Sequence, residues 1–254
     1  MSQRLDQLLV EKGLASSRTK AKDLIEAGQV IVKQFGVPQT NLKPSTLVAE
    51  SAEIAISPGA VDRYVSRGGL KLEGALKQIS ASVSGACVLD VGQSTGGFTD
   101  CVLQAGAAKV VGIDVGHNQL QARLKNDSRV QSLEGMNARS LDVNPALLMI
   151  CQTLQFQWVV VDLSFISLTL VLPALARVAV SGTQLLALVK PQFEVGPEGL
   201  GKGGVVRDPL LYLEVERKIK SGATEAGWIV KAYFESSIEG KDGNKEFFIH
   251  AVRK

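Results

Sequence analysis

The chain has 254 residues, of which 45% are hydrophobic and 21% charged, a composition typical of folded proteins that argues against long disordered tails. No apolar run reaches the roughly 18 residues of a membrane-spanning helix, and the N-terminus shows no secretory leader pattern. We therefore expect a cytoplasmic protein without a membrane partner. The formal net charge of +3 does not by itself indicate nucleic-acid binding, although residues 1–43 carry seven Lys or Arg against four Asp or Glu.

Cysteine and histidine usage excludes several classes of site. The three cysteines, Cys87, Cys101 and Cys151, form no Cys-x-x-Cys pair and no disulfide framework. Only two histidines are present, His117 and His250, so a histidine-rich metal site or a Ser-His-Asp triad has little to draw on. We expect no metal.

The first 58 residues predict a small domain of helices followed by strands. Leu5, Leu8 and Leu9 share one stripe of a helix over Arg4–Glu11, and a second helix is expected from Ser16 to Gly28. Extended segments follow at Val30–Val32, Thr46–Val48 and Glu53–Ile56, with a turn at Phe35–Pro38. Because Ser57-Pro58-Gly59 is the clearest turn signal of the chain, we expect domains at 1–58 and 67–254 joined by a linker at 59–66.

Beyond the linker, strands alternate with helices, which is typical of a parallel sheet covered on both faces. The seven expected strands are Cys87–Val91, Lys109–Asp114, Val130–Leu133, Trp158–Asp162, Gln184–Val189, Trp228–Phe234 and Phe247–Val252. The expected helices are Leu70–Gln78, Phe98–Ala105, Asn118–Asn126, Pro145–Thr153, Leu168–Val180 and Pro209–Ala226. Too few residues separate the last two strands for a crossover helix, so they should form an antiparallel hairpin at the edge of the sheet.

A glycine-rich segment between the first of these strands and its helix, Asp90–Phe98, indicates a cofactor site. Glycines let a ligand approach the backbone, and the helix N-terminus offers free N–H groups. A plain strand-to-helix turn remains the alternative. Asp114 ends the next strand, where a carboxylate can accept both hydroxyls of a ribose. Because Asp90 would repel a pyrophosphate but suit the ammonium of a methionine group, the pattern favours S-adenosylmethionine over NAD.

Two further charged residues end strands at the edge where open α/β sheets bind ligands. Asp162 follows the fourth strand and could face the reacting centre or cap the next helix. Lys190 follows the apolar fifth strand, where lysine is uncommon, although a solvated lysine is an equal alternative. Methylation at pyrimidine carbon 5 needs a cysteine nucleophile, usually after a proline, and no cysteine of this chain follows a proline. Methylation of exocyclic base amines typically uses an Asn/Asp-Pro-Pro-aromatic turn, which Asp162-Leu163-Ser164-Phe165 does not match. Lysine and aspartate suit the orientation of a ribose 2′-hydroxyl.

Six segments together resemble the TlyA family of ribosomal RNA cytidine 2′-O-methyltransferases, also labelled haemolysin A. They are Ser66–Leu72, Asp90–Asp100, Val160–Leu168, Val189–Glu194, Gly204–Asp208 and Gly243–Phe247. The N-terminal pattern around Arg4-Leu5-Asp6 and Ser17-Arg18 is similar to an S4-like RNA-binding domain. The resemblance implies an α/β fold: a seven-stranded Rossmann-like, FtsJ-like methyltransferase domain that uses S-adenosylmethionine, behind a small α+β S4-like domain.

The resemblance also assigns roles to residues. The catalytic tetrad maps onto Lys71, Asp162, Lys190 and Glu246. The expected cofactor residues are Asp90, Gly92, Ser94, Thr95, Gly96, Gly97, Phe98, Asp114, Asn137, Ala138 and Arg139. The chain departs from the family at Gln93, where a small Ala or Ser is usual, at Tyr64, where Trp is common, and at Met136, where Thr often stands. The longer side chain of Gln93 could crowd the cofactor.

A basic face, built mainly on the small N-terminal domain, is expected to bind RNA through phosphate contacts. Its candidate residues are Arg4, Lys12, Arg18, Lys20, Lys22, Arg63 and Arg67. The expected partner is ribosomal RNA or a ribosomal subunit, with the large subunit favoured because the chain ends eight residues after Glu246, and a monomer is the default. Two alternatives stay open: a membrane-active haemolysin, and a non-catalytic RNA-binding protein with a residual cofactor pocket.

Overall fold

A computed structural model describes residues 2–26, 28–34, 37–39, 42–56, 63–240 and 243–254. Tertiary contacts divide the chain into two compact units, Met1–Arg67 and Gly68–Lys254. The predicted turn at 57–59 and the first part of the predicted linker lie outside the described residues. Within the described part of the chain, no helix is both long and apolar enough to cross a bilayer.

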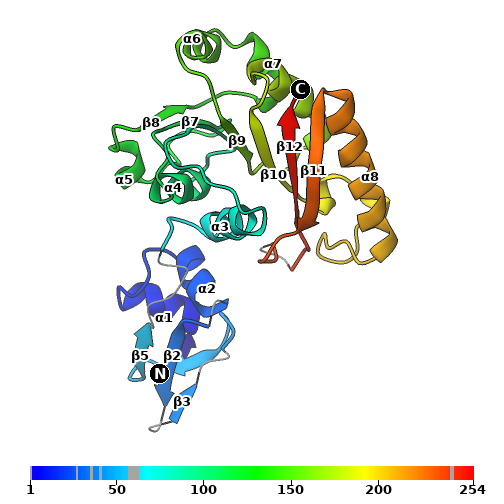
Figure 1. Cartoon of the computed structure of the whole chain (residues 1–254). Coiled ribbons are helices and arrows are strands. Elements are labelled where there is room, and N and C mark those ends of the chain that lie inside the picture. Colours follow the sequence, from blue (N-terminus) through cyan, green and yellow to red (C-terminus); the bar gives the residue numbers. More distant parts are fainter. Residues whose placement is uncertain (1, 27, 35–36, 40–41, 57–62, 241–242) are drawn as a thin grey trace. The chain divides into compact units, whose positions relative to one another are not determined.

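The first unit combines two helices with two small antiparallel sheets (Figure 1). The helices are α1 (Leu5–Glu11) and α2 (Arg18–Glu26). Strand β1 (Ser2–Arg4) pairs with β4 (Leu47–Ala49), and β2 (Val30–Gln34) lies between β3 (Val37–Gln39) and β5 (Glu53–Ile56). Both predicted helices are confirmed. Of the expected turn at residues 35–38, Phe35 and Gly36 lie outside the described residues, and Val37 and Pro38 belong to β3.

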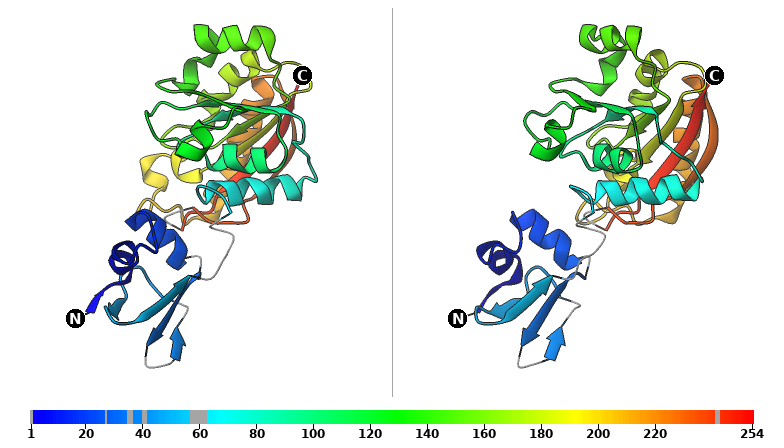
Figure 2. Two further views of the ribbon diagram at one scale, coloured as in Figure 1. Left: turned by 90° about the vertical axis from the view of Figure 1, so that its left-hand side faces the viewer. Right: turned by 60° about the vertical axis from the view of Figure 1, so that its left-hand side comes forward.

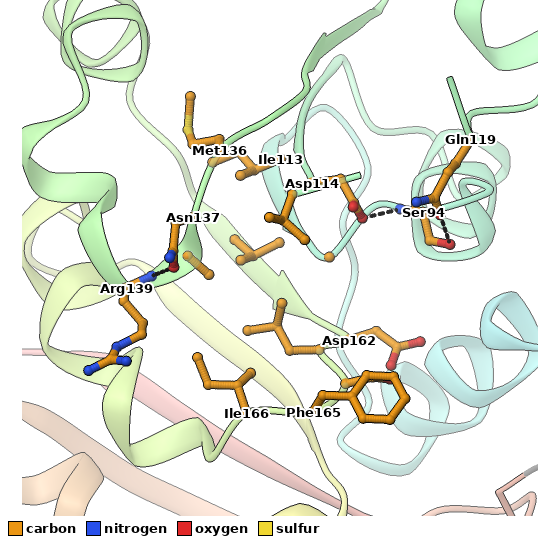
Figure 3. A pocket seen from close by; sticks show the side chains of 16 residues that line it. Ser94, Ile113, Asp114, Gln119, Met136, Asn137, Arg139, Asp162, Phe165 and Ile166 are labelled. Atoms are coloured by element: carbon orange, nitrogen blue, oxygen red, sulfur yellow. Dashed lines mark hydrogen bonds between the residues drawn. The ribbon is translucent and has the colours of Figure 1, made fainter. Parts of the chain in front are cut away.

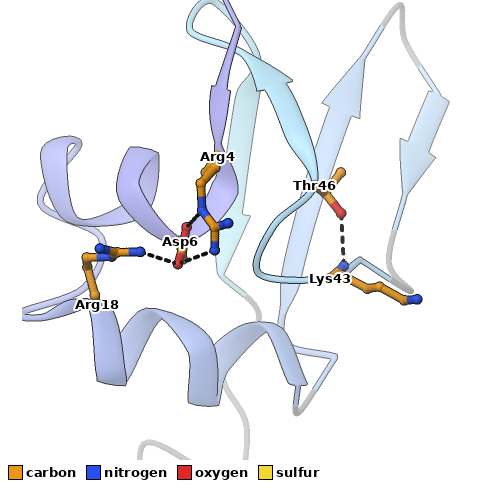
Figure 4. Close-up of polar contacts among 5 residues, drawn as sticks. All are labelled: Arg4, Asp6, Arg18, Lys43 and Thr46. Carbon is orange, nitrogen blue, oxygen red and sulfur yellow. Dashed lines mark hydrogen bonds and ion pairs between the residues drawn. The ribbon is translucent and has the colours of Figure 1, made fainter.

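A buried carboxylate organises the helical side of this unit. Asp6 has no exposed surface, and Figure 4 shows it between two arginines. Arg4 donates to both carboxylate oxygens at 3.0 and 3.1 Å, and Arg18 donates to Oδ2 at 3.1 Å. These hydrogen bonds, chiefly the one from Arg4, lower the pKa of Asp6 to about 2.

The second unit contains a seven-stranded sheet in the order β11-β12-β10-β9-β6-β7-β8. The strands are β6 (Cys87–Val91), β7 (Lys109–Ile113), β8 (Val130–Leu133), β9 (Trp158–Val161), β10 (Gln184–Val189), β11 (Trp228–Glu235) and β12 (Phe247–Arg253). Only β12 runs antiparallel to its neighbours, β10 and β11. The predicted α/β class and the antiparallel pairing of the last two strands are confirmed. The hairpin stands at the edge of the sheet as expected, with β11 as the edge strand and β12 between it and β10.

Helices cover both faces of this sheet (Figure 2). On one face, α6 (Pro145–Thr153), α7 (Leu172–Val178) and α8 (Pro209–Glu225) share an apolar core with alternate strand residues such as Leu89 and Val91. The opposite face carries α3 (Gly68–Gln78) and α4 (Gly97–Gln104), and Phe98 of α4 stacks on Phe248 of β12 at 6.4 Å. Since neighbouring side chains of a strand point to opposite faces, Asp90 lies on the α4 face.

Two predicted helices differ from the structure. The segment Asn118–Asn126 is helical only over α5 (Ala122–Lys125), because Asn118 adopts a left-handed conformation with φ of +55°. Leu168–Val180 is divided into a short 3₁₀ turn, η3 (Leu168–Leu170), and α7. Pro173 has no backbone N–H to continue the preceding turn, so it stands in the first turn of a new helix.

Candidate active site

Strand topology gathers the candidate catalytic residues at one edge of the sheet. Asp162 directly follows β9 and Lys190 directly follows β10, two parallel neighbours. Glu246 precedes β12, which is antiparallel, and Phe247 pairs with Val189 at the end of β10. The start of β12 therefore lies at the same edge as the carboxyl ends of the parallel strands.

The four residues of the predicted tetrad form two ion pairs. Lys71 on α3 places its Nζ 2.5 Å from Oε2 of Glu246, and both side chains are buried. Lys190 places its Nζ 2.6 Å from Oδ1 of Asp162 and also donates to Oγ of Ser164 at 2.9 Å. Each lysine is thus held by a carboxylate, Lys71 through a charged hydrogen bond and Lys190 through an ion pair.

A cavity of about 480 Å³ opens beside Asp162, a size usual for small-molecule sites. Figure 3 shows Asp114 and Ser94 on one side of it, Asn137 and Arg139 on the other, and Asp162 with Phe165 below. Six of the predicted cofactor residues line it: Gly92, Ser94, Asp114, Asn137, Ala138 and Arg139. The other five, Asp90, Thr95, Gly96, Gly97 and Phe98, are not among its lining residues.

Asp114 is fixed by the loops around it. Its Oδ2 accepts a hydrogen bond from the backbone N–H of Ser94, and its Oδ1 accepts one from that of Gly116, both at 2.7 Å. Ser94 in turn donates from Oγ to Gln119 at 2.9 Å. This arrangement leaves a carboxylate of defined orientation at the wall of the cavity, as recognition of vicinal ribose hydroxyls requires.

At the far end of the cavity, Asn137 caps a 3₁₀ turn, η2 (Ala138–Val143). Its Oδ1 accepts from the backbone N–H of Arg139 at 2.9 Å. Met136, Asn137 and Arg139 form a wall with one apolar and two polar side chains. That mixture can receive a heteroaromatic ring.

Gly92 is required by chain packing as well as by any ligand. Its φ is +89°, and a Cβ at this position would overlap the carbonyl oxygen of Asp162. The glycine loop after β6 and the loop after β9 therefore touch through their backbones. This contact sets how closely the cavity and the Lys190–Asp162 pair approach each other.

Asp90 lies beneath the loop and has no exposed surface. Thr99 donates from Oγ1 to its Oδ2 at 2.6 Å, while Oδ1 accepts no hydrogen bond from the described residues. Burial, more than any other cause, raises the pKa of Asp90 to about 7, against the opposing effect of the Thr99 hydrogen bond. A buried carboxylate with one unpartnered oxygen is a charge that lacks a partner.

Gln93 points away from the cavity. Its side chain, 3% exposed, donates from Nε2 to Thr99 at 2.9 Å and accepts at Oε1 from Ser132 at 2.7 Å. It does not line the cavity. In this arrangement the long side chain does not crowd a cofactor.

A second buried carboxylate joins the loops that carry Asp162 and Lys190. Glu194 follows η4 (Pro191–Phe193), and its oxygens accept from the Ser167 hydroxyl at 2.6 Å and from the Leu168 backbone N–H at 2.7 Å. Lys218 of α8 neutralises it at 3.0 Å. Sequence reasoning assigned no role to Glu194, although it lies in one of the resembling segments.

Phe165 is the most unusual residue at the rim. Its side chain is 90% exposed, its φ of +64° is strained for a non-glycine residue, and its ring lies 5.0 Å from that of Phe193. Sequence reasoning also missed several residues that line the cavity: Val91, Ile113, Val115, Gln119, Leu163, Ser164, Phe165 and Ile166. They are the last residues of β6 and β7 or lie in the loops that follow β7 and β9, and this position at the carboxyl ends of strands is the signal that identifies them.

The seven candidate RNA-contacting residues all belong to the first unit. Arg4 and Arg18 bind Asp6 yet keep 40% and 54% of their side chains exposed. Lys12 is exposed at the end of α1, whereas Lys20 and Lys22 are half-buried on α2. Arg63 is exposed and lies over the ring of Tyr64, with its guanidinium carbon 5.3 Å from the ring centroid, and Arg67 is half-buried.

Comparison with known proteins agrees with this architecture. Residues 64–253 match the FtsJ-like methyltransferase family, and residues 3–32 match the S4 domain. Together with the seven-stranded sheet and its cavity, these matches define a Rossmann-like methyltransferase with an S4 domain at its N-terminal end.

Comparison with individual relatives identifies the family of this chain more narrowly. The chain is 43% identical to the 16S/23S rRNA (cytidine-2′-O)-methyltransferase TlyA of Mycobacterium tuberculosis, over 97% of this chain and 88% of that protein. It is 31% identical to the 23S rRNA (cytidine-2′-O)-methyltransferase TlyA of Campylobacter jejuni, over 96% and 97%. A solved structure from Streptococcus thermophilus, provisionally described as a hemolysin, is 40% identical with a TM-score of 0.76, covering all of this chain and 89% of that one. The chain belongs to the TlyA family.

Family membership implies S-adenosylmethionine as the methyl donor, and the residues present fit it. The cavity offers a fixed carboxylate for a ribose and a wall for a ring. The unpartnered oxygen of Asp90 lies buried beneath the glycine loop, where a cationic amino-acid group would supply a partner.

Proposed function

We propose that this protein methylates the ribose 2′-oxygen of a cytidine in ribosomal RNA, using S-adenosylmethionine, and that its substrate is the large subunit. The observation that carries the proposal is the pair of lysine–carboxylate contacts beside the cavity. The nucleotide and the RNA are inferred from the relatives: both TlyA proteins are named as cytidine 2′-O-methyltransferases, and 23S rRNA is common to both names.

The chain's own residues hold and orient the nucleophile. The bound cofactor supplies an electrophilic methyl group, so the protein has to aim the 2′-hydroxyl in line with it. Lys190, held by Asp162 and Ser164, would polarise the 2′-hydroxyl, and the proton that methyl transfer releases would leave through the Lys190–Asp162 pair to solvent. We assign the Lys71–Glu246 pair to holding the ribose, because Glu246 precedes β12 at the same edge of the sheet as Lys190.

Asp114, Asn137 and Arg139 would hold the nucleoside part of the cofactor, because they line the same cavity. The exposed ring of Phe165, backed by Phe193, offers a surface on which an unstacked base can lie. The basic residues of the S4 domain would bind phosphates of structured RNA.

The test is to incubate the protein with methyl-labelled S-adenosylmethionine and separated ribosomal subunits, followed by alkaline hydrolysis. A methylated 2′-oxygen cannot attack the adjacent phosphate, so a labelled dinucleotide survives. We expect that product from the large subunit, its loss in Lys190→Ala, and its retention in the matched control Lys77→Ala, whose side chain is 73% exposed. Labelled mononucleotides would contradict ribose methylation, and label confined to the small subunit would contradict the assignment of the subunit.

The haemolysin alternative rests on the naming of relatives. It predicts leakage of dye from liposomes by the wild-type protein and equally by Lys190→Ala. We expect no leakage at concentrations that support methylation. Leakage that is independent of Lys190 would favour the alternative.

A further inference from the structure

The long side chain of Gln93 is buried, and the neighbouring strands provide the space for it. Asp90 of β6, Gly112 of β7 and Ser132 of β8 are register partners in three neighbouring strands. They therefore form one row on the face that α4 covers. Gly112 is the member without a side chain, and a Cβ there would overlap the carboxamide of Gln93. The Gln93 side chain occupies the space that this glycine leaves.

The hydrogen bonds along this row all donate toward Asp90. Ser132 donates to Gln93 at 2.7 Å, Gln93 donates to Thr99 at 2.9 Å, and Thr99 donates to Asp90 at 2.6 Å. Because the Thr99 hydroxyl has a single proton, acceptance from Gln93 directs that proton to Asp90. The chain of donors thus ends on a carboxylate and favours its ionised form.

We propose that Gln93 is a positioning residue that, seated over Gly112, holds Thr99 as a donor to Asp90 and so favours the ionised form of this carboxylate beneath the loop that receives the amino-acid end of the cofactor. The inference rests on the proposed use of S-adenosylmethionine. Asp90 does not line the cavity, whereas Val91 and Gly92 do, so its charge acts on the ligand through the intervening backbone.

The surroundings of Asp90 make its charge state sensitive to this chain of donors. The nearby carboxylates of Asp162 and Asp114 disfavour ionisation, as burial does, while the Thr99 hydrogen bond favours it. Lys190, which pairs with Asp162, is the cation on that side. Removal of a hydrogen-bond donor from this chain should therefore raise the pKa of Asp90.

The experiment measures binding of two probes by calorimetry between pH 6 and 8.5. S-adenosylhomocysteine carries the amino-acid group, and 5′-methylthioadenosine lacks it. In Gln93→Met, which retains the volume but not the hydrogen bonds, S-adenosylhomocysteine should bind about tenfold more weakly at pH 7, with the midpoint of its pH profile shifted upward. Affinity for 5′-methylthioadenosine should be unchanged.

Two further variants separate positioning from packing. Gly112→Ala keeps Gln93 but displaces its carboxamide, so it should reproduce the Gln93→Met phenotype, and the double variant Gln93→Ala/Gly112→Ala should show no additional loss. Gln104→Met, an exposed glutamine on the same helix as Thr99, is the matched control. Thermal unfolding of each variant shows that it is folded.

Equal losses for both probes, or an unshifted pH midpoint in Gln93→Met, would overturn the inference and leave Gln93 a packing residue. If the wild-type protein bound neither probe, the proposed cofactor itself would be wrong. The two failures are thereby distinguishable.

Discussion

Replacement of Glu246 by Gln tests how strongly the fold depends on the buried Lys71–Glu246 ion pair. Lys71 is 8% exposed and Glu246 3% exposed, and their charged atoms lie 2.5 Å apart. At an effective dielectric constant of about 20, two unit charges at this distance attract by about 7 kcal/mol. Desolvation and relaxation offset part of this, so removal of one charge should cost about 3 to 5 kcal/mol of unfolding free energy.

Tryptophan fluorescence during urea unfolding measures this loss of unfolding free energy, because it reports on the second unit, which contains the ion pair. The chain contains two tryptophans, Trp158 and Trp228, and both belong to the second unit. A loss of 3 to 5 kcal/mol corresponds to a fall in Tm of about 6 to 20 °C for a domain of this size. The control, Glu235→Gln, removes the exposed partner of Lys245 and should cost less than about 1 kcal/mol.

The apolar double variant Lys71→Met/Glu246→Leu should recover most of the lost stability, since no buried charge is left without a partner. A Glu246→Gln protein within about 1 kcal/mol of wild type, or a double variant no more stable than the single one, would refute the reasoning.

Three other outcomes follow from the described contacts. Because the pKa of Asp6 is about 2 when folded against 3.8 for the free group, its contribution to stability is fully present above about pH 5 and is lost as the pH falls through 2. Amide exchange in α1 should show Asp6→Asn weaker than wild type by about 1 to 2 kcal/mol at pH 7, with most of this difference gone at pH 2. Asp114→Asn should weaken binding of S-adenosylhomocysteine about tenfold or more, and unchanged calorimetric affinity would remove Asp114 from the site. Phe165→Ala should reduce kcat/KM for ribosomal RNA methylation about tenfold without changing cofactor affinity, which equal kinetics would contradict.

Local patterns predicted most of the sheet because its strands carry their own signal. Trp158–Val161 is buried throughout and rich in β-branched residues, as a strand with both faces covered must be. The positions of Asp162 and Lys190 followed from strand ends alone. Their pairing with each other did not, because it depends on side-chain geometry across neighbouring loops.

The errors in the sequence analysis arose where distant contacts override local propensity. The segment before Ala122 has helix-forming residues, yet the backbone N–H of Asn118 is bound by Glu134 from beyond β8. The direction of the Gln93 side chain depends on Gly112 and Ser132, which lie on two other strands. Neither relation is visible in a window of adjacent residues.

The interior position of β12 has a consequence for synthesis of the chain. It follows every other strand of the sheet in sequence, yet it lies between β10 and β11. Until the ribosome has released it, β10 has an unpaired edge, and such an edge is prone to pair with other chains. Glu246 emerges just ahead of this strand, so until then Lys71 lacks its counter-charge. Nascent chains that stop short of residue 247 should therefore need chaperones, and the active site is completed only when its last strand arrives.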